Sequence, residues 1–255
     1  MVKKQPYVAV ICGHGTSLDG KWDPGTTYDK DKNGKISTKE TEAGLMLKIT
    51  EACVKYLRKS NIKVYSDADT GNNLNMVKTI YKANTLDVDA YISFHCDYYK
   101  APTGTLPLYH PNSSKGKKLA TLINKHVMKD MNMKTRGVTK RSDLGELNDT
   151  NMPSCIFETG SIKADYDKLS QADKYGKAAA KGICEYLGVD FVDEFKVKAK
   201  SNLIVRATSS LASKKIKTLE KGKTYTIVST NKSKNRGKLK NGGWITITDK
   251  YVTKL

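Results

Sequence analysis

Short apolar runs alternate with longer amphipathic segments over the first 190 residues of the chain. Runs rich in β-branched and aromatic residues predict strands, and apolar positions three or four residues apart predict helices. The predicted strands are 7–13, 62–65, 88–95, 106–109 and 154–157, and the predicted helices are 40–59, 74–84, 115–129 and 171–187. This alternation is typical of an α/β fold with a mostly parallel sheet flanked by helices.

The pattern changes after residue 190. Short β-type runs at 203–206, 224–228 and 244–247 are separated by turns rich in Lys, Ser, Asn and Gly, with no helical segment between them. Such spacing predicts a small all-β barrel. We therefore expect two domains, 1–190 and 198–255, joined by a linker at 191–197.

Charge divides the chain in the same way. The formal net charge is +19, and residues 196–255 carry 16 Lys and Arg against two acidic residues, or +14 of that total. A basic domain suits a polyanionic partner, such as nucleic acid, a membrane surface or an anionic cell wall. A merely solubilising surface is the alternative, and the steep asymmetry favours a partner.

The cysteines, the apolar stretches and the first residues indicate the cellular compartment in which the protein is made. The five cysteines have no Cys-x-x-Cys spacing and mostly lie beside apolar residues, which indicates reduced core residues rather than a disulfide framework. No apolar stretch approaches the roughly 20 residues of a membrane span. The first residues run directly into a strand without a cleavage site, so we expect no signal peptide, synthesis in the cytoplasm and no membrane insertion.

Polar residues occupy positions that an apolar core disfavours. His14 follows the first strand between two glycines, and His95 ends the strand 88–95. Glu42 lies in the middle of the apolar stripe of the helix 40–59, whereas Glu40 points about 160° away from it. Each residue alone has a structural interpretation: a loop or strand-end His, or a first-turn Glu favoured by the helix dipole. Together they supply the three ligands of a catalytic zinc site, leaving one position for water.

A second carboxylate, Glu158, follows the strand 154–157. A hydrolytic zinc site needs a nearby general base that takes a proton from water and delivers it to the leaving group. Glu158 is the candidate for this role, with a salt-bridge or helix-dipole Glu as the alternative.

The order of these residues and their neighbours carries a family resemblance. The series is Gly13-His14-Gly15, Asp23-Pro24-Gly25, Glu42, Ser93-Phe94-His95, Arg136-Gly137-Val138, Met152-Pro153 and Phe157-Glu158-Thr159-Gly160. Over about residues 5–188 it resembles the zinc-dependent N-acetylmuramoyl-L-alanine amidases of the amidase-3 type. The resemblance implies Zn²⁺ ligands at His14, Glu42 and His95, and a catalytic acid/base at Glu158.

Two positions depart from the pattern of many relatives. Asp97 stands where an Asn is common two residues after the second His, and Ser161-Ile-Lys-Ala replaces a stretch that usually carries an aromatic residue and an Asn. These departures concern substrate contacts rather than the metal chemistry.

The basic region resembles a bacterial SH3-type domain. The matching segments are Leu203-Ile-Val-Arg206, Leu219-Glu-Lys-Gly222, Gly243-Trp244-Ile245 and Tyr251-Val252. Such modules commonly bind cell wall peptides, and a passive spacer is the alternative.

One further motif lies outside the family pattern. Asp29, Asp31, Asn33, Gly34 and Glu40 match the oxygen donors and turn glycine of an EF-hand-type Ca²⁺ loop. The alternative is a turn leading into a capping box, with Ser37 at the N-cap and Glu40 at N3.

The sequence therefore predicts a peptidoglycan hydrolase that cleaves the amide between N-acetylmuramic acid and L-alanine. We expect a phage endolysin that lyses a Gram-positive host, with the basic domain on anionic wall polymer. A host autolysin or sporulation amidase would share the chemistry. A non-catalytic wall-binding protein would leave the candidate catalytic residues without a role. A nucleic-acid-binding protein is disfavoured because the basic domain has few aromatic residues for base stacking.

Overall fold

The computed structural model describes residues 4–71, 74–231, 233 and 235–255. The chain divides into two compact units, residues 1–191 and 192–255. Among the described residues, no helix combines the length and the apolar character that crossing a membrane requires.

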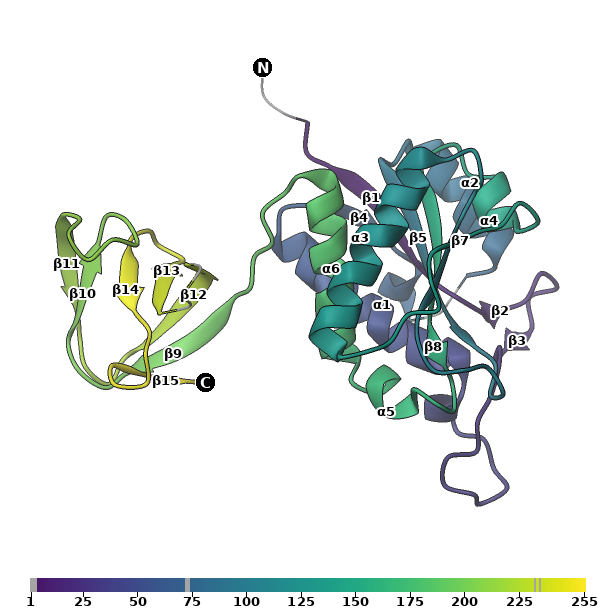
Figure 1. Cartoon of the computed structure of the whole chain (residues 1–255), viewed down its shortest axis with the longest axis horizontal. Coiled ribbons are helices and arrows are strands. Elements are labelled where there is room, and N and C mark those ends of the chain that lie inside the picture. Colours follow the sequence, from purple (N-terminus) through teal and green to yellow (C-terminus); the bar gives the residue numbers. More distant parts are fainter. Residues whose placement is uncertain (1–3, 72–73, 232, 234) are drawn as a thin grey trace. The chain divides into compact units, whose positions relative to one another are not determined.

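A six-stranded sheet forms the centre of the first unit (Figure 1). In spatial order its strands are β4 (Lys63–Tyr65), β1 (Tyr7–Cys12), β5 (Ala90–Asp97), β8 (Ser154–Ser161), β6 (Leu106–Tyr109) and β7 (Thr139–Lys140). The first four are parallel, and β6 is antiparallel to β8. The predicted α/β fold with a mostly parallel sheet is confirmed.

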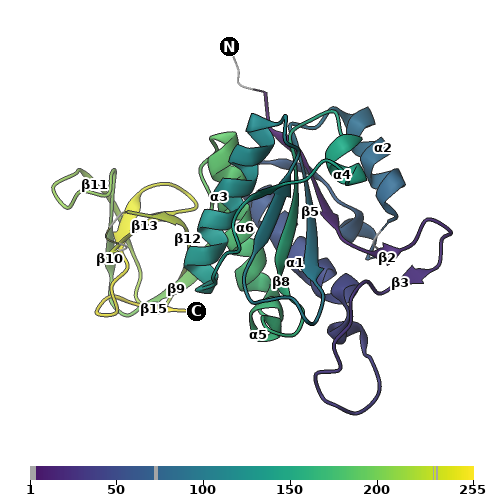
Figure 2. The same ribbon diagram turned by 45° about the vertical axis from the view of Figure 1, so that its right-hand side comes forward.

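Helices cover both faces of this sheet. The longer helices are α1 (Glu42–Lys59), α2 (Met76–Leu86), α3 (Ser114–Met131) and α6 (Ala172–Leu187). Short elements complete the unit: β2 (Gly15–Thr16), β3 (Trp22–Asp23), η1 (Thr38–Glu40), η2 (Asp67–Thr70), α4 (Gly145–Asn148) and α5 (Tyr166–Leu169). Figures 1 and 2 show α1, α3 and α6 on one face of the sheet, and α2 and α4 on the other.

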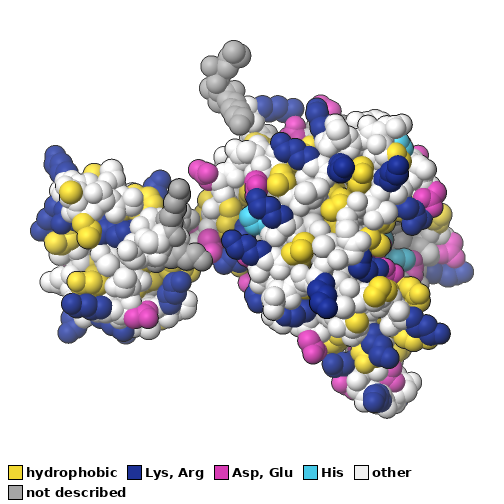
Figure 3. Space-filling model, in the orientation of Figure 1, with side chains coloured by type: hydrophobic (Ala, Val, Ile, Leu, Met, Phe, Trp, Pro, Cys, Tyr) yellow, Lys and Arg dark blue, Asp and Glu magenta, His cyan; other side chains and the backbone are white. Residues whose placement is uncertain are grey.

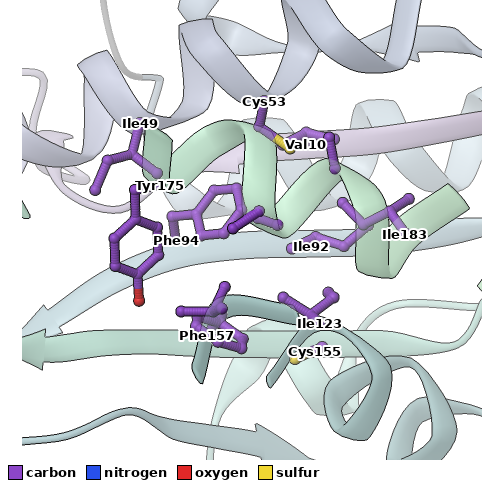
Figure 4. Packing of buried hydrophobic residues seen from close by; sticks show 14 of the residues in the cluster. Val10, Ile49, Cys53, Ile92, Phe94, Ile123, Cys155, Phe157, Tyr175 and Ile183 are labelled. Carbon is purple, nitrogen blue, oxygen red and sulfur yellow. The ribbon is translucent and has the colours of Figure 1, made fainter. Parts of the chain in front are cut away.

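The main core lies between the sheet and α1, α3 and α6. Alternate residues of β1, β5 and β8 point into it, as expected for strands, and Phe94 contacts Phe157 with ring centroids 6.2 Å apart. Figure 4 shows these rings beside Tyr175 of α6 and Ile49 of α1. All five cysteines are buried and unbridged, which confirms the prediction of reduced core residues.

Strand β8 is longer than the sequence predicts. It continues to Ser161, so Glu158 lies within a strand and not after its end. Pairing on both sides explains the extension, because Glu158 is opposite His95 of β5 and Leu106 of β6. The hydroxyl of Thr159 also donates to the carbonyl of His95 (2.8 Å).

The second unit is an antiparallel sheet of seven strands. In spatial order they are β11 (Lys215–Leu219), β10 (Leu203–Arg206), β14 (Trp244–Thr246), β13 (Arg236–Leu239), β12 (Thr224–Thr230), β9 (Phe195–Ala199) and β15 (Val252–Lys254). Its core contains the inward side chains of these strands, among them Val205, Ile227 and Ile245. The all-β expectation is confirmed, and the assignment to the SH3 type stays a prediction.

Strand β9 begins at Phe195, inside the predicted linker 191–197. Val197 is fully buried in the core of the second unit, while Lys196 and Lys198 are exposed. This alternation has the period of a half-buried strand, so the linker prediction overlooked a short strand with lysines on its outer face.

Candidate metal centre

Three side chains that are far apart in the sequence meet at the carboxyl ends of β1 and β5. Nε2 of His14 lies 3.4 Å from one oxygen of Glu42, and Nδ1 of His95 lies 3.2 Å from the other. One ligand atom from each residue falls within 4.8 Å of the other two. Within the part of the chain that the structure describes, this is the only such group of three or more His, Cys, Asp or Glu residues.

These distances fit a zinc ion. Zinc bonds of about 2.0–2.2 Å to nitrogen and oxygen in a tetrahedron place neighbouring ligand atoms roughly 3.3–3.5 Å apart. Two imidazole nitrogens and one carboxylate are also a donor set that zinc accepts in hydrolytic sites. The residues predicted as ligands therefore come together in a geometry that suits the ion.

Helix α1 begins at Glu42, and of the two glutamates it is Glu42 that faces the histidines. Glu42 is a first-turn residue, as the dipole interpretation requires, but its side chain is buried against both histidines. Its oxygens also accept the backbone N–H groups of Thr26 (3.0 Å) and Cys96 (3.0 Å). Glu40 lies two residues earlier, at the end of η1, and its carboxylate is bonded to Lys30 and Ser37 instead.

Two glycines let the backbone approach the site closely. A Cβ atom on Gly25 would lie 2.6 Å from Glu42 Oε2, and one on Gly13 would lie 2.5 Å from His95 Nδ1. His14 itself adopts a left-handed conformation with φ of 60°. Non-glycine residues rarely adopt this conformation, and those that do are often found at functional sites.

Each histidine is held by a further carboxylate. His14 donates from Nδ1 to Asp23 (2.8 Å), which leaves Nε2 free to face Glu42. His95 donates from Nε2 to Glu146 (3.2 Å), which leaves Nδ1 free to face Glu42. When the imidazoles are neutral, these carboxylates favour the proton on Nδ1 of His14 and on Nε2 of His95, so that the other nitrogen of each ring faces Glu42.

Glu146 is a site residue that the sequence reasoning missed. It lies in the short helix α4, is 6% exposed, and accepts the hydroxyl of Tyr91 (2.8 Å), which in turn lies 3.2 Å from the hydroxyl of Thr79. A buried acid between Leu144 and Leu147 was the available signal. It was too weak to use because nothing in the sequence places α4 next to β5.

The electrostatics of the site favour a cation. Burial lowers the pKa of His95, but Glu146 and Glu42 raise it more, so that the pKa lies well above its usual value. Burial raises the pKa of Glu42, and His95 and His14 outweigh that effect and hold the pKa below its usual value. Three carboxylates around two imidazoles therefore stabilise positive charge between them.

Glu158 lies beside the three candidate ligands, and one of its oxygens has no hydrogen-bond partner. It pairs in register with His95 on the neighbouring strand, so the two side chains share one face of the sheet. Burial, assisted by Glu42 and Asp97 and opposed by His95 and Arg136, raises the pKa of Glu158 to about 7. Its Oε2 atom is buried and has no hydrogen-bond partner, so the oxygen is available to a proton.

Asp97, which departs from the family pattern, forms an ion pair with Arg136 (2.8 Å). Arg136 also donates to the carbonyl of Gly104 (3.0 Å). The carboxylate offsets the charge of an arginine that belongs to the family-like series, and it stands near Glu158.

A cavity of about 550 Å³ borders the metal centre. His14, His95 and Glu146 line it, together with Leu74 and Met76 at the start of α2. This volume is in the range of sites for small ligands.

The predicted calcium loop has another hydrogen-bond pattern. Both oxygens of Glu40 are occupied: one accepts the N–H of Lys30 (2.7 Å), and the other accepts the N–H (2.9 Å) and the hydroxyl (2.6 Å) of Ser37. These bonds, those from Ser37 above all, lower the pKa of Glu40 to about 2.

The other predicted calcium ligands also accept hydrogen bonds from the loop backbone. The carboxylate of Asp29 accepts the N–H groups of Asn33 and Gly34, and the side-chain oxygen of Asn33 accepts the backbone N–H of Lys35. Asp31 is exposed, and its N–H lies 3.4 Å from Glu40. The capping interaction between Ser37 and Glu40 is present.

Known structures share the fold of the first unit. An N-acetylmuramoyl-L-alanine amidase from Clostridium difficile 630 is 22% identical, with a TM-score of 0.63 over 73% of this chain and 98% of that chain. The amidase AmiC2 of Nostoc punctiforme is 21% identical, with a TM-score of 0.59 over 72% of this chain and 97% of that chain. The catalytic domain of the CD27L endolysin, which targets Clostridia difficile, is 18% identical, with a TM-score of 0.57 over 71% of this chain and 98% of that chain.

Curated protein sequences contain no significant match to this chain. The sequence profile of the Amidase_3 family, described as N-acetylmuramoyl-L-alanine amidase, matches residues 8–188, which is more than half of the chain and includes all four predicted catalytic and zinc residues. The chain therefore belongs to the Amidase_3 family of N-acetylmuramoyl-L-alanine amidases.

Proposed function

We propose that the chain is a zinc-dependent amidase that uses His14, Glu42 and His95 as ligands and Glu158 as the acid/base. The observation that carries the proposal is the pairing of a three-ligand group with Glu158, whose buried Oε2 atom has no hydrogen-bond partner, on the strand next to that of His95. The substrate bond is the amide between the N-acetylmuramic acid lactyl group and L-alanine.

The roles of the residues follow from their positions. When bound, zinc activates water and polarises the scissile carbonyl. Glu158 takes the proton from the attacking water, and its raised pKa lets it return that proton to the leaving amine. Asp23 and Glu146 keep the two imidazoles in the tautomers that present a lone pair to the ion.

Mass analysis of the fragments released from purified peptidoglycan tests the proposed reaction. An amidase releases peptides with a free L-alanine amino terminus and leaves intact glycan strands. New reducing ends would instead indicate a glycosidase, and new amino termini within the peptide would indicate a peptidase. Either of these results would contradict the assignment.

Glu146 provides a prediction about the metal. Replacing Glu146 with Ala is expected to weaken zinc binding by about 10- to 100-fold, because His95 loses the partner that orients its ring. Competition with a chromophoric chelator measures this affinity. Asp143→Ala, an exposed acid in the preceding loop, is the matched control, and equal zinc affinity in Glu146→Ala and the unsubstituted protein would show that the contact is incidental.

For the biological role of the enzyme, we propose a phage endolysin. A basic all-β unit joined to a compact amidase unit suits an enzyme that must stay on the wall while it cuts. The protein produced in the cytoplasm of a Gram-positive cell is expected to leave cells intact until a membrane pore is opened. Lysis or secretion without a pore would favour the host autolysin or sporulation amidase instead.

The structure supports a calcium site less well than it supports the zinc site. The ion would have to displace three donors from Glu40, so we expect calcium up to about 1 mM to leave the melting temperature unchanged. A thermal melt across a calcium titration measures this. A rise that Glu40→Ala abolishes would establish the site predicted from Asp29, Asp31, Asn33 and Glu40.

A further inference from the structure

Strand register in the second unit brings cationic side chains into a row. Arg206 of β10 is opposite Lys215 of β11 and opposite Trp244 of β14, and Trp244 is opposite Lys238 of β13. Directly opposed residues share one face of a sheet, and strands are about 4.8 Å apart. The pairing of β10 with β11 shifts register between Val205 and Arg206, so Arg206 and Lys215 face each other across a bulge. The four residues, which we call the cationic row, therefore cross four strands over roughly 14 Å.

The cationic row faces away from the core. Val205 and Ile245, the sequence neighbours of Arg206 and Trp244, are buried inside the unit, so alternation turns the row outward. Lys215 and Lys238 are exposed, and Arg206 and Trp244 are half-buried. Figure 3 shows Lys and Arg side chains spread over the visible face of this unit.

A fourth cation on the same face is held in an unfavourable environment. Arg236 lies two residues before Lys238 on β13 and is only 4% exposed. It donates to the hydroxyl of Thr246 (2.9 Å) and the carbonyl of Trp244 (3.3 Å), while its Nε atom is buried without a partner. Burial and, secondly, the charge of Arg206 lower the pKa of Arg236. No carboxylate pairs with either arginine in the described part of the chain.

The strands of the second unit carry no acidic residue. The second unit contains Asp193, Glu194, Glu220 and Asp249. All four lie outside its strands, and Glu194 forms an ion pair with Lys240 (3.4 Å). The mutual repulsion of Arg206 and Arg236 is therefore uncompensated on the sheet, and a bound anion would relieve it.

We propose that the cationic row binds a phosphodiester-linked polyanion of the cell wall. Guanidinium and ammonium groups both bind phosphate oxygens, and a row of this length spans successive charges of a polymer rather than one small anion. The indole of Trp244 between the cations offers an apolar contact to the sugar or polyol between phosphates. The choice of a cell wall ligand rests on the proposed function, because an enzyme that cuts peptidoglycan works where this polymer is found.

Two double variants of the full-length protein test the site against net charge alone. K215A/K238A removes the exposed ends of the cationic row, and K196A/K198A removes two exposed lysines of β9. Both lower the net charge by two. Co-sedimentation with purified Gram-positive walls at moderate salt is expected to show roughly tenfold weaker binding for K215A/K238A and near-normal binding for K196A/K198A.

Three results would overturn the proposal. Equal losses in the two double variants would mean that net charge, not the row, determines binding. Undiminished binding to walls stripped of phosphodiester polymer by hydrofluoric acid would exclude this ligand. Displacement from walls by a single-stranded oligonucleotide at lower concentration than by the released polymer would identify a nucleic-acid site, in which Trp244 stacks on bases.

Two further measurements separate the possible failures. Thermal melts check that both double variants fold, and K215E/K238E must bind walls more weakly than K215A/K238A if charge at these positions matters. Turnover of a soluble muramoyl-peptide reports the amidase activity independently of wall binding. Loss of wall binding with normal turnover supports the cationic row, whereas absent turnover in every form would refute the proposed function and leave the binding result standing.

Discussion

Replacing Glu158 with Gln is expected to reduce turnover of purified peptidoglycan by at least about 100-fold while zinc content stays normal. The amide cannot take a proton from water, and the three proposed ligands are untouched by the change. Single-turnover kinetics together with metal analysis of the same sample measure both effects. Activity close to that of the unsubstituted protein would exclude Glu158 as the acid/base.

The same substitution has a pH-dependent effect on stability. The pKa of Glu158 is about 7 in the folded protein against an ordinary value of 4.5, so folding favours its protonated form. The free energy of unfolding therefore loses a contribution as the pH rises from about 4.5 to about 7, and the loss is complete above that range. In chelated protein, the melting temperature of Glu158→Gln should exceed that of the unsubstituted protein at pH 8 by more than at pH 5. A pH-independent difference would contradict the raised pKa.

Replacing Glu42 with Ala is expected to abolish stoichiometric zinc binding, with affinity reduced by more than about 100-fold. Glu42 is the only carboxylate of the three-ligand group, and it faces both imidazoles. Glu40→Ala is the matched control two residues away. It should keep zinc but lose the interaction with Ser37, at a cost of about 1 kcal/mol and a few degrees of melting temperature. Zinc loss in Glu40→Ala and retention in Glu42→Ala would reverse the assignment.

The sequence predicted the architecture well where hydrophobic periodicity was long. The amphipathic segments 40–59 and 171–187 became α1 and α6, and strand ends placed His14 and His95 at one edge of the sheet. Short elements gave no comparable signal: α4 has four residues and β7 has two. Their positions depend on tertiary packing, which single-sequence patterns do not contain.

In the candidate site, too, some residues could be predicted from the local sequence and others could not. The two histidines, Glu42 and Glu158 stood out because each is polar beside apolar runs. Glu146 did not, because its importance comes from a contact with His95 across 51 residues of sequence. Asp23 belongs to the motif Asp23-Pro24-Gly25, but nothing in that motif indicates its hydrogen bond to His14. Residues that orient ligands are thus harder to predict than the ligands themselves.

Metal removal and restoration test the central claim most directly. Protein stripped with a chelator is expected to lose turnover of purified peptidoglycan and to regain it with one equivalent of zinc, while Glu42→Ala stays inactive under the same treatment. Full activity of the chelated, metal-free protein would contradict the assignment of His14, Glu42 and His95 as the catalytic zinc site.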